Sequence, residues 1–325
     1  MAELRFHPFI KDWIMIASHR QARPQMPKDW CPFCPGSGRV PDDYDVLKYD
    51  NDFPALSPEP PEPDDVATNF LQTRPAYGKC EVILYSPDHT VTLPELPLAH
   101  VQKLVALWQQ RFEALRQDSQ AKYVFIFENR GKEVGVTMPH PHGQVYAYPF
   151  LPKKLELEIA AAKEHLAETG RCLFCDWMHE EISDGRRVIF ENAHFAVILP
   201  FFTEYPYGVY IISKAHKPYI TDFDAQESAA LAGIIRSTVG MLDSLFGRPF
   251  PYMMCMHNAP VNGEDPSAYY HFHIEFFPPL RSREQIKFNA SSETGAWAHC
   301  NPTAPEEKAV ELRKAYERFV SEDRA

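Results

Sequence analysis

The chain has 325 residues, 45% of them hydrophobic, and a formal net charge of −11. Its length fits one large domain or two ordinary ones, and its charge argues against nucleic acid or an anionic membrane as the main partner. The N-terminus lacks the apolar segment of a secretion signal, and we find no apolar run long enough to span a bilayer. We therefore expect a cytoplasmic protein. The net negative charge does not exclude an anionic small molecule as its ligand, because a few local donors are enough to bind one.

The first half of the chain mixes strand and helix patterns. Residues 24–66 are rich in Pro, Gly and Asp, which predicts a mostly irregular segment. Elsewhere the apolar periodicity predicts a pair of strands within 4–17, strands over 79–86, 123–128 and 144–150, and helices over 92–115 and 153–169. Gly170 is a natural stop for the second helix.

The second half shows a similar succession. The same periodicities predict two short strands within 188–202, strands over 208–213, 252–258 and 270–276, and a helix over 224–246. Alternating strands and helices of this kind predict a mixed fold in which helices pack on a sheet.

Seven cysteines are present, and an odd number without a signal peptide argues against a disulfide framework. Four of them form two C-x-x-C pairs, Cys31 with Cys34 and Cys172 with Cys175. Such pairs are typical of metal or redox sites. The loop-like Pro-Gly-Ser-Gly after the first pair favours a metal site over a thioredoxin-like helix start.

One order of features occurs twice: C-x-x-C, a strand that ends near a histidine, a helix, a strand, and His-x-His. The spacings are similar, since His89 follows Cys34 by 89 − 34 = 55 residues and His216 follows Cys175 by 216 − 175 = 41. This predicts a duplicated αβ unit, with halves over 1–170 and 171–325.

Each half contributes two cysteines and two histidines, the ligand set of a closed tetrahedral zinc site. The alternative is a mixture of buried cysteines and strand-end histidines. The predicted metal ligands are Cys31, Cys34, His89 and His140 in the first half and Cys172, Cys175, His216 and His271 in the second.

The stretch 138–144 contains His140-Pro141-His142, followed by Gly143 and Gln144. Pro141 favours extended backbone, in which residues two apart point to one face. If His140 binds metal, His142 is available as a nucleophile toward phosphorus, with Gly143 allowing close approach and Gln144 donating to a phosphoryl oxygen. The alternative is a pair of surface histidines in a Pro-rich turn.

The second half has Ile274-Glu275 where the first has Gly-Gln. A carboxylate there would repel phosphate, so we expect one catalytic site, in the first half, and a structural role for His273.

Two other polar segments are candidates for nucleotide contacts. Arg20 and Arg23, beside a proline, are either a guanidinium pair for phosphate or an ordinary basic turn. Asn51 and Asp52, beside an aromatic residue, either hold a base and ribose or form an Asx turn.

With these motifs the sequence resembles the galactose-1-phosphate uridylyltransferase family of the histidine-triad superfamily. The resemblance rests on residues 19–24, 51–53 and 85–96, on Phe-Glu-Asn-Arg-Gly at 127–131 and on Pro-His-Pro-His-Gly-Gln at 139–144. It implies an α+β fold made of two histidine-triad-like halves, the first of them catalytic. It also implies an enzyme in which His142 takes UMP from UDP-glucose, releases glucose 1-phosphate, and passes UMP to galactose 1-phosphate in a ping-pong exchange.

The resemblance also implies roles for individual residues. Arg20, Arg23, Asn51, Asp52 and Asn129 would hold the nucleotide, with Gly143 close by and Gln144 on the phosphoryl group. Lys287 and Phe288 match a stretch that reaches the sugar phosphate across a dimer interface, so a homodimer is expected. The resemblance separately implies zinc in the first site.

The sequence departs from the better-known members in two places. Those members often lack the second C-x-x-C pair and bind metal through residues that correspond to Glu158, His257, His271 and His273. We favour the cysteines as ligands in this chain, because thiolates bind zinc better than one carboxylate does. The segment 291–296 is similar to relatives that transfer an adenylyl group from ADP-glucose to phosphate. An ADP-glucose phosphorylase is therefore one alternative, and a catalytically inactive, zinc-stabilised nucleotide-binding module is another.

Overall fold

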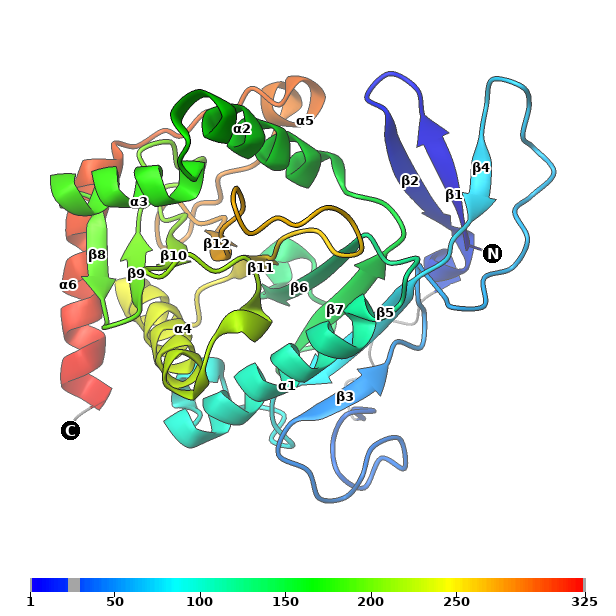
Figure 1. Ribbon diagram of the computed structural model, residues 1–325. Coiled ribbons are helices and arrows are strands. Elements are labelled where there is room, and N and C mark those ends of the chain that lie inside the picture. Colours follow the sequence, from blue (N-terminus) through cyan, green and yellow to red (C-terminus); the bar gives the residue numbers. More distant parts are fainter. Residues whose placement is uncertain (1, 23–29, 324–325) are drawn as a thin grey trace.

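A computed structural model describes residues 2–22 and 30–323. The N-terminal segment forms a small three-stranded antiparallel sheet, set beside the rest of the molecule (Figure 1). Its strands, in spatial order, are β2 (Asp12–Ala17), β1 (Ala2–His7) and β4 (Thr73–Pro75).

The main sheet has nine strands, and all neighbouring pairs in it are antiparallel. In spatial order the strands are β3 (Leu47–Asp50), β5 (Lys79–Leu84), β7 (His142–Tyr148), β6 (Tyr123–Arg130), β11 (Tyr252–His257), β12 (His273–Phe277), β10 (Tyr210–Ser213), β9 (Phe195–Ile198) and β8 (Val188–Glu191).

The order of these strands is symmetric about the pair β6–β11. Going outward, β6, β7, β5 and β3 on one side correspond to β11, β12, β10 and β9 on the other. The registers correspond too, because His142 lies opposite Leu84 of β5, and His273 lies opposite Ile212 of β10. The two halves of the sheet therefore repeat one arrangement, and the α+β fold expected from the sequence is confirmed. The boundary at residues 170 and 171 stays a prediction.

One face of the sheet carries the main hydrophobic core. There α1 (Leu98–Arg116) and α4 (Ala225–Phe246) lie against each other, and α6 (Pro305–Asp323) packs on α4 and β8 (Figure 1). Trp108 and Phe112 of α1 are fully buried, and burial of such a side chain contributes about 1.5–3 kcal/mol. From the sheet, alternate residues such as Val145 and Ile274 face this core.

The other face of the sheet carries α2 (Lys153–Thr169) and α3 (Leu173–Asp184), which pack together, and the short α5 (Ser291–Ala296) lies nearby (Figure 1). Leu155 of α2 packs with Tyr146 and Tyr148, and Met178 of α3 packs with Ile212. The segment around Phe33 covers the outer strands of the first half, so this face holds both C-x-x-C pairs.

Several elements differ from the sequence-based expectations. Four residues of the segment expected to be irregular form β3, which completes the edge of the sheet by pairing with β5. We did not expect α3, α5 or α6, and helix α1 begins at Leu98 instead of near residue 92, after a 3-10 turn and Pro97. One helix, α4, is long and apolar enough to span a membrane by length and composition, contrary to our expectation; ten of its residues are buried in the fold.

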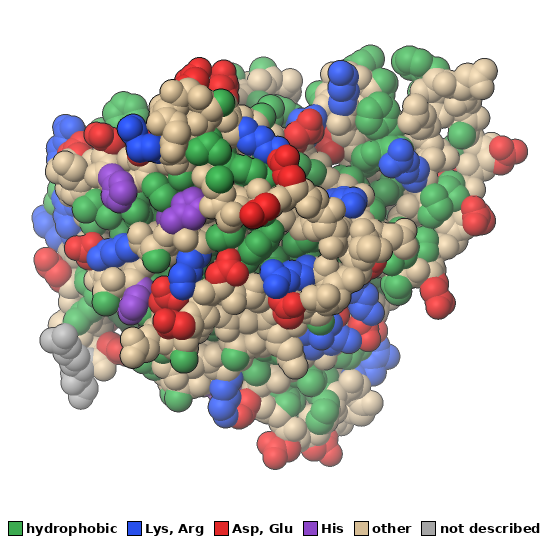
Figure 2. All heavy atoms as spheres, viewed as in Figure 1, with side chains coloured by type: hydrophobic (Ala, Val, Ile, Leu, Met, Phe, Trp, Pro, Cys, Tyr) green, Lys and Arg blue, Asp and Glu red, His purple; other side chains and the backbone are tan. Residues whose placement is uncertain are grey.

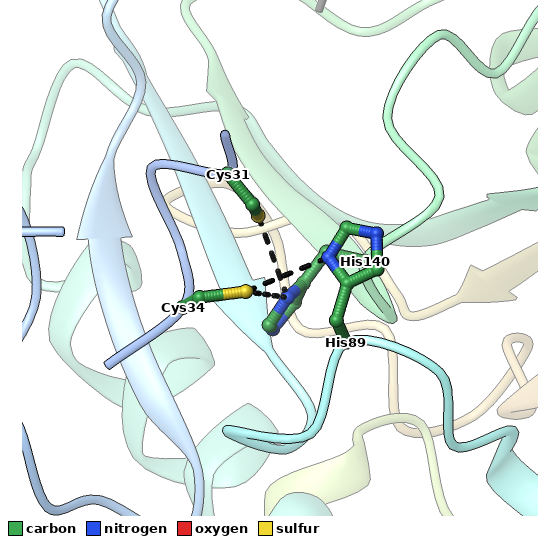
Figure 3. Close-up of side chains that lie close together, drawn as sticks. All are labelled: Cys31, Cys34, His89 and His140. Atoms are coloured by element: carbon green, nitrogen blue, oxygen red, sulfur yellow. Dashed lines mark hydrogen bonds between the residues drawn. The ribbon is translucent and has the colours of Figure 1, made fainter. Parts of the chain in front are cut away.

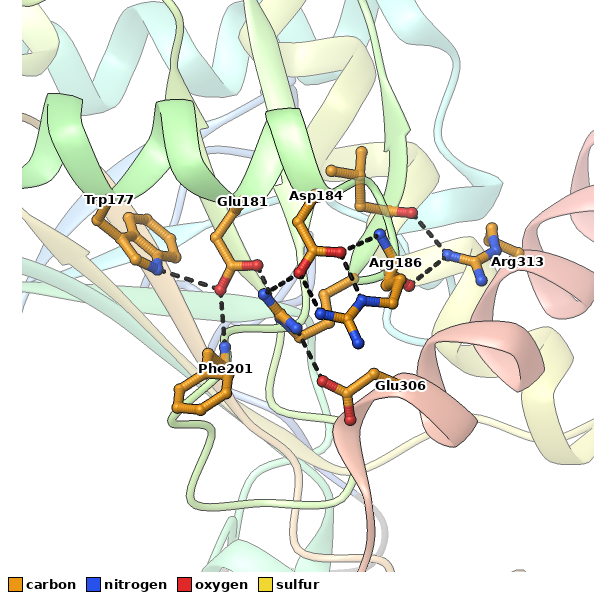
Figure 4. A network of polar contacts seen from close by, with 9 residues as sticks. Trp177, Glu181, Asp184, Arg186, Phe201, Glu306 and Arg313 are labelled. Carbon is orange, nitrogen blue, oxygen red and sulfur yellow. Dashed lines mark hydrogen bonds and ion pairs between the residues drawn. The ribbon is translucent and has the colours of Figure 1, made fainter.

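On the face shown in Figure 2, acidic and basic side chains are interspersed over the surface. Ion pairs around the buried Arg187 join α3 to α6. The guanidinium of Arg187 bonds to Glu181 and Asp184 of α3, at 2.7 and 3.0 Å, and to Glu306 of α6 at 2.8 Å. Figure 4 shows these carboxylates converging from the two helices.

We predict that Arg187→Leu lowers the free energy of unfolding by about 3 kcal/mol, because it leaves Glu181, which is 2% exposed, without its cationic partner. Urea unfolding followed by circular dichroism measures this change. Arg186→Leu is the matched control, since the Arg186 side chain is 68% exposed and should be replaceable without measurable loss. Equal losses in the two variants would contradict the account.

Candidate active site and metal centres

The two histidines of the His-Pro-His stretch are placed by the start of β7. His140 is buried and lies just before the strand, and His142 is its first residue. Both rings lie edge-on to Phe33, at 5.8 and 6.0 Å, so they share one side of the chain as predicted. Nδ1 of His142 lies 2.7 Å from the carbonyl oxygen of His140, which assigns the proton to Nδ1 and the lone pair of the neutral ring to Nε2.

A cavity of about 260 Å³ opens in front of His142. A guanidinium and two carboxamides from separate elements meet in it. They are Arg20 from the 3-10 turn Ser18–Ala22, Asn129 from β6 and Gln144 from β7. Its remaining walls are Phe127, Gly135, Val136, Thr137, Met138 and Tyr146. An imidazole nitrogen facing a cation and two amides is an arrangement that can bind and attack an anionic phosphoryl group.

Other predicted substrate residues lie outside the lining of this cavity, and Arg23 lies outside the described residues. Asn51 forms an Asx turn, with its Oδ1 accepting the backbone N–H of Phe53 at 2.9 Å. Asp52 accepts bonds from Arg39 at 2.8 Å and from Tyr49 at 3.0 Å. The turn is nevertheless near the 3-10 segment, because the ring of His19 bonds to the carbonyl oxygen of Pro54.

The Lys-Phe pair also lies outside this lining. Nζ of Lys287 is 3.2 Å from Oδ1 of Asn289 and lies over the ring of Tyr205, so this side chain is held within its own subunit. The side chain of Phe288 is 73% exposed. Of the pair, Phe288 is the residue available to a neighbouring chain.

The structure brings the first predicted ligand set together (Figure 3). Sγ of Cys34 lies 3.6 Å from Nδ1 of His89 and 3.7 Å from Nδ1 of His140, and Sγ of Cys31 lies 3.7 Å from the same His140 atom. Tetrahedral zinc with ordinary Zn–S and Zn–N bonds separates sulfur and nitrogen ligands by about 3.6 Å. These three separations match this value, and all four ligand atoms lie within 4.8 Å of one another, so the residues fit a zinc ion.

Neighbouring groups orient His140 and shift the pKa values of His140 and Cys34. Nε2 of His140 lies 2.8 Å from the carbonyl oxygen of Ser86, which orients Nδ1 toward the thiols. Burial lowers the pKa of His140 to about 4, so the ring is neutral near pH 7. Burial and the neighbouring Cys31 raise the pKa of Cys34 to about 11, so metal binding there would release a proton.

The second predicted ligand set also converges. Sγ of Cys175 lies 3.1 Å from Nδ1 of His216 and 3.4 Å from Nδ1 of His271. Nε2 of His271 lies 2.7 Å from the hydroxyl oxygen of Ser213, at the end of β10. In the first half the corresponding atom of His140 contacts Ser86, just after the end of β5. Unlike the first pair, this C-x-x-C pair opens a helix, α3.

His271 belongs to the cysteine set, yet the other three residues of the alternative set also form a group. Nδ1 of His257 is 3.0 Å from Glu158, and His273 lies beside them. A cationic side chain already lies beside this group, because Nζ of the exposed Lys154 lies 2.5 Å from Glu275, which also faces His257 at 3.4 Å. The second half thus has a carboxylate paired with an ammonium group at the strand position where the first half has Gln144.

Comparison with known proteins agrees with this geometry. Family models described as galactose-1-phosphate uridyl transferase, N-terminal domain and C-terminal domain, match residues 1–152 and 158–312. The galactose-1-phosphate uridylyltransferase of Thermotoga maritima is 41% identical over 97% of this chain and 98% of its own length. The chain belongs to the galactose-1-phosphate uridyl transferase family. It is an enzyme of the galactose-1-phosphate uridylyltransferase type.

Other relatives and solved structures support membership of this family. The galactose-1-phosphate uridylyltransferase of Haemophilus influenzae is 32% identical over 89% of this chain and 87% of its own. A solved uridylyltransferase superposes with a TM-score of 0.90 at 33% identity, covering 97% of this chain and 99% of that one. An ADP-glucose phosphorylase from Arabidopsis thaliana shares the fold, with a TM-score of 0.75 at 23% identity over 97% of this chain and 99% of its own.

Behind the cavity, Glu128 of β6 points into the core between two tyrosine hydroxyls. Tyr252 donates to it at 2.9 Å and Tyr85 at 3.2 Å. The Tyr85 hydroxyl would lie 2.3 Å from a Cβ at residue 143, so only glycine fits next to His142. Burial raises the pKa of Glu128 to about 7.

This pKa gives a prediction for stability. The unfolded carboxyl titrates near pH 4.5 and the folded one near 7, so the folded state binds more protons between these values and loses stability as the pH rises through them. We expect Glu128→Gln to remove that loss. The variant should gain on the order of 3 kcal/mol relative to wild type between pH 5 and pH 8. Urea unfolding at several pH values measures the difference, and a difference independent of pH would contradict the assignment.

Proposed function

We propose that this enzyme exchanges UMP between UDP-glucose and galactose 1-phosphate through a uridylyl-His142 intermediate. The observation that carries the proposal is the cavity in which His142, Gln144, Arg20 and Asn129 meet, with the lone pair of His142 placed on Nε2. The names of the relatives at 41% and 32% identity supply galactose 1-phosphate and the uridylyl group.

The first half-reaction forms one bond and breaks one. Nε2 of His142 attacks the α-phosphorus, and the bond from that phosphorus to the bridging oxygen breaks, so glucose 1-phosphate leaves with the electron pair. The ring then carries UMP on Nε2 and a proton on Nδ1, which the carbonyl of His140 accepts at 2.7 Å. In the second half-reaction a phosphate oxygen of galactose 1-phosphate attacks the same phosphorus, and Nε2 leaves.

Charge develops on the non-bridging oxygens of the phosphoryl group in each step. We assign the amide NH₂ of Gln144 and the guanidinium of Arg20 to these oxygens, and Asn129 to the nucleotide, because all three line the cavity. We retain Arg23, Asn51, Asp52 and Gly143 as proposed substrate contacts. The second half is not a competing site, because Glu275 stands where Gln144 does, and its carboxylate pairs with Lys154.

We further propose zinc in both cysteine-containing sets, as a structural ion. Zinc held by two thiolates and two imidazoles is closed to substrate, so it would fix the segment carrying Cys31 and Cys34 to the strand ends that carry His89 and His140. The ligand distances in the first set support this proposal.

A homodimer in the cytoplasm completes the proposal. The exposed ring of Phe288 supports a contact in which Phe288 of one chain approaches the substrate bound by another. Lys287 would join this contact by exchanging its bond to Asn289 for one to the sugar phosphate. All seven cysteines lie in the described part of the chain and none is in a disulfide, which agrees with a reducing compartment.

The covalent intermediate can be observed directly. Intact-protein mass spectrometry after mixing with UDP-glucose alone should show an acid-labile UMP adduct on wild type and none on His142→Asn. His273→Asn is the matched control, because His273 holds the corresponding position in the second half and should leave the adduct intact. An AMP adduct formed from ADP-glucose instead would identify an ADP-glucose phosphorylase. No adduct with either nucleotide would favour an inactive binding module.

Metal analysis tests the zinc proposal. Wild type should contain two zinc ions per chain, and Cys34→Ser and Cys175→Ser should each lose one and be strongly destabilised. His257→Ala tests the alternative set. If it lost a metal that Cys175→Ser retained, the second site would consist of Glu158 and the histidines.

A further inference from the structure

We propose that Tyr146 is a positioning residue that acts on the reaction through Gln144, by holding its carboxamide with the NH₂ group toward the phosphoryl oxygens. The inference rests on the proposed function and extends it to a residue that does not react with the substrate. In the sequence, Tyr146 is only an aromatic residue of a strand, and such a residue is ordinarily part of the core.

The geometry comes from the period of the strand. Residues 142, 144 and 146 of β7 point to one face, so the nucleophile, the phosphoryl donor and Tyr146 form a row. The Tyr146 hydroxyl donates to Oε1 of Gln144 at 3.0 Å. The ring is fixed in turn, since it is 6% exposed and lies edge-on to Phe127 at 5.1 Å.

Orientation matters because the two ends of a carboxamide have opposite polarity. Phosphoryl oxygens accept hydrogen bonds and donate none, so an amide turned by 180° would set its oxygen against them. A bond that engages Oε1 therefore prepares Gln144 for its role before the substrate binds. Preorganised donors of this kind are worth more than donors that must reorient during the reaction.

Arg20 offers the Tyr146 hydroxyl no competing acceptor. A phenol can donate or accept, whereas the guanidinium of Arg20, which lines the same cavity, can only donate. The phenol proton therefore goes to Oε1 of Gln144. Burial raises the pKa of Tyr146 to about 12, which keeps that proton in place at neutral pH.

The second half of the chain supports the pairing independently. There His273, Glu275 and Phe277 of β12 correspond to His142, Gln144 and Tyr146 of β7. The second half, which has Glu275 in place of the glutamine, also has Phe277 in place of the tyrosine and therefore no hydroxyl at that position. His273 keeps the same contact as His142, with its Nδ1 3.0 Å from the carbonyl oxygen of His271. The histidine geometry thus occurs in both halves, whereas the Gln–Tyr pair occurs only in the proposed catalytic one.

A double-mutant cycle tests the inference. The rate of adduct formation from UDP-glucose in a single turnover is measured for Tyr146→Phe, Gln144→Ala and the double variant. Removal of a phosphoryl donor lowers the rate about 100-fold or more, and loss of the bond that orients it should lower the rate about tenfold. Because Tyr146 acts through Gln144, the double variant should be no slower than Gln144→Ala. The KM of Tyr146→Phe should change much less than its kcat.

Tyr148→Phe is the matched control, since it removes a buried hydroxyl from the next position on the same face of β7 and should keep the wild-type rate. Thermal melting checks that each variant is folded. Losses that multiply in the double variant, or a Tyr146→Phe enzyme with the wild-type rate, would overturn the inference alone. A wild type that forms no adduct would overturn the proposed function, and the inference with it.

Discussion

The hydrogen bond from Nδ1 of His142 to the carbonyl of His140 is the contact on which the account of this enzyme depends. It places the lone pair of the neutral ring on Nε2, and it does so with a backbone group that the first ligand set holds still. His140 faces two thiols through Nδ1 and the carbonyl of Ser86 through Nε2. Only Pro141 thus separates a residue of the first ligand set from the imidazole that we propose as the nucleophile.

The duplicated fold explains why this arrangement occurs twice. Differences in sequence between the two halves explain why only the first suits the proposed chemistry. Both halves have the same strand order, the same His-x-His contact and the same type of ligand set. They differ at the residues beyond the histidine. The first half has Gln144 lining a cavity together with Arg20, whereas the second half has Glu275 at the corresponding strand position, paired with Lys154.

Much of this could be predicted from sequence, because local periodicity and repeated spacing are direct signals. The succession of most strands along the chain, the grouping of eight cysteines and histidines into two sets and the common side of His140 and His142 followed from such patterns. Helices α3 and α6 were missed, since few of their residues are buried and their stability comes from contacts such as the Arg187 network. The role of Tyr146 was missed because no spacing rule tells a phenol that orients an amide from one that fills a core. For Asn51 the sequence allowed either a nucleotide contact or an Asx turn, and the structure shows the turn.

The most direct test of the central claim is the site of attachment in the intermediate. Nuclear magnetic resonance of the ¹⁵N-histidine-labelled protein, after reaction with UDP-glucose, distinguishes phosphorus on the two ring nitrogens. The structure predicts attachment at Nε2 of His142, with the proton kept on Nδ1. Attachment at Nδ1, or at any other histidine, would contradict the arrangement from which the mechanism is derived.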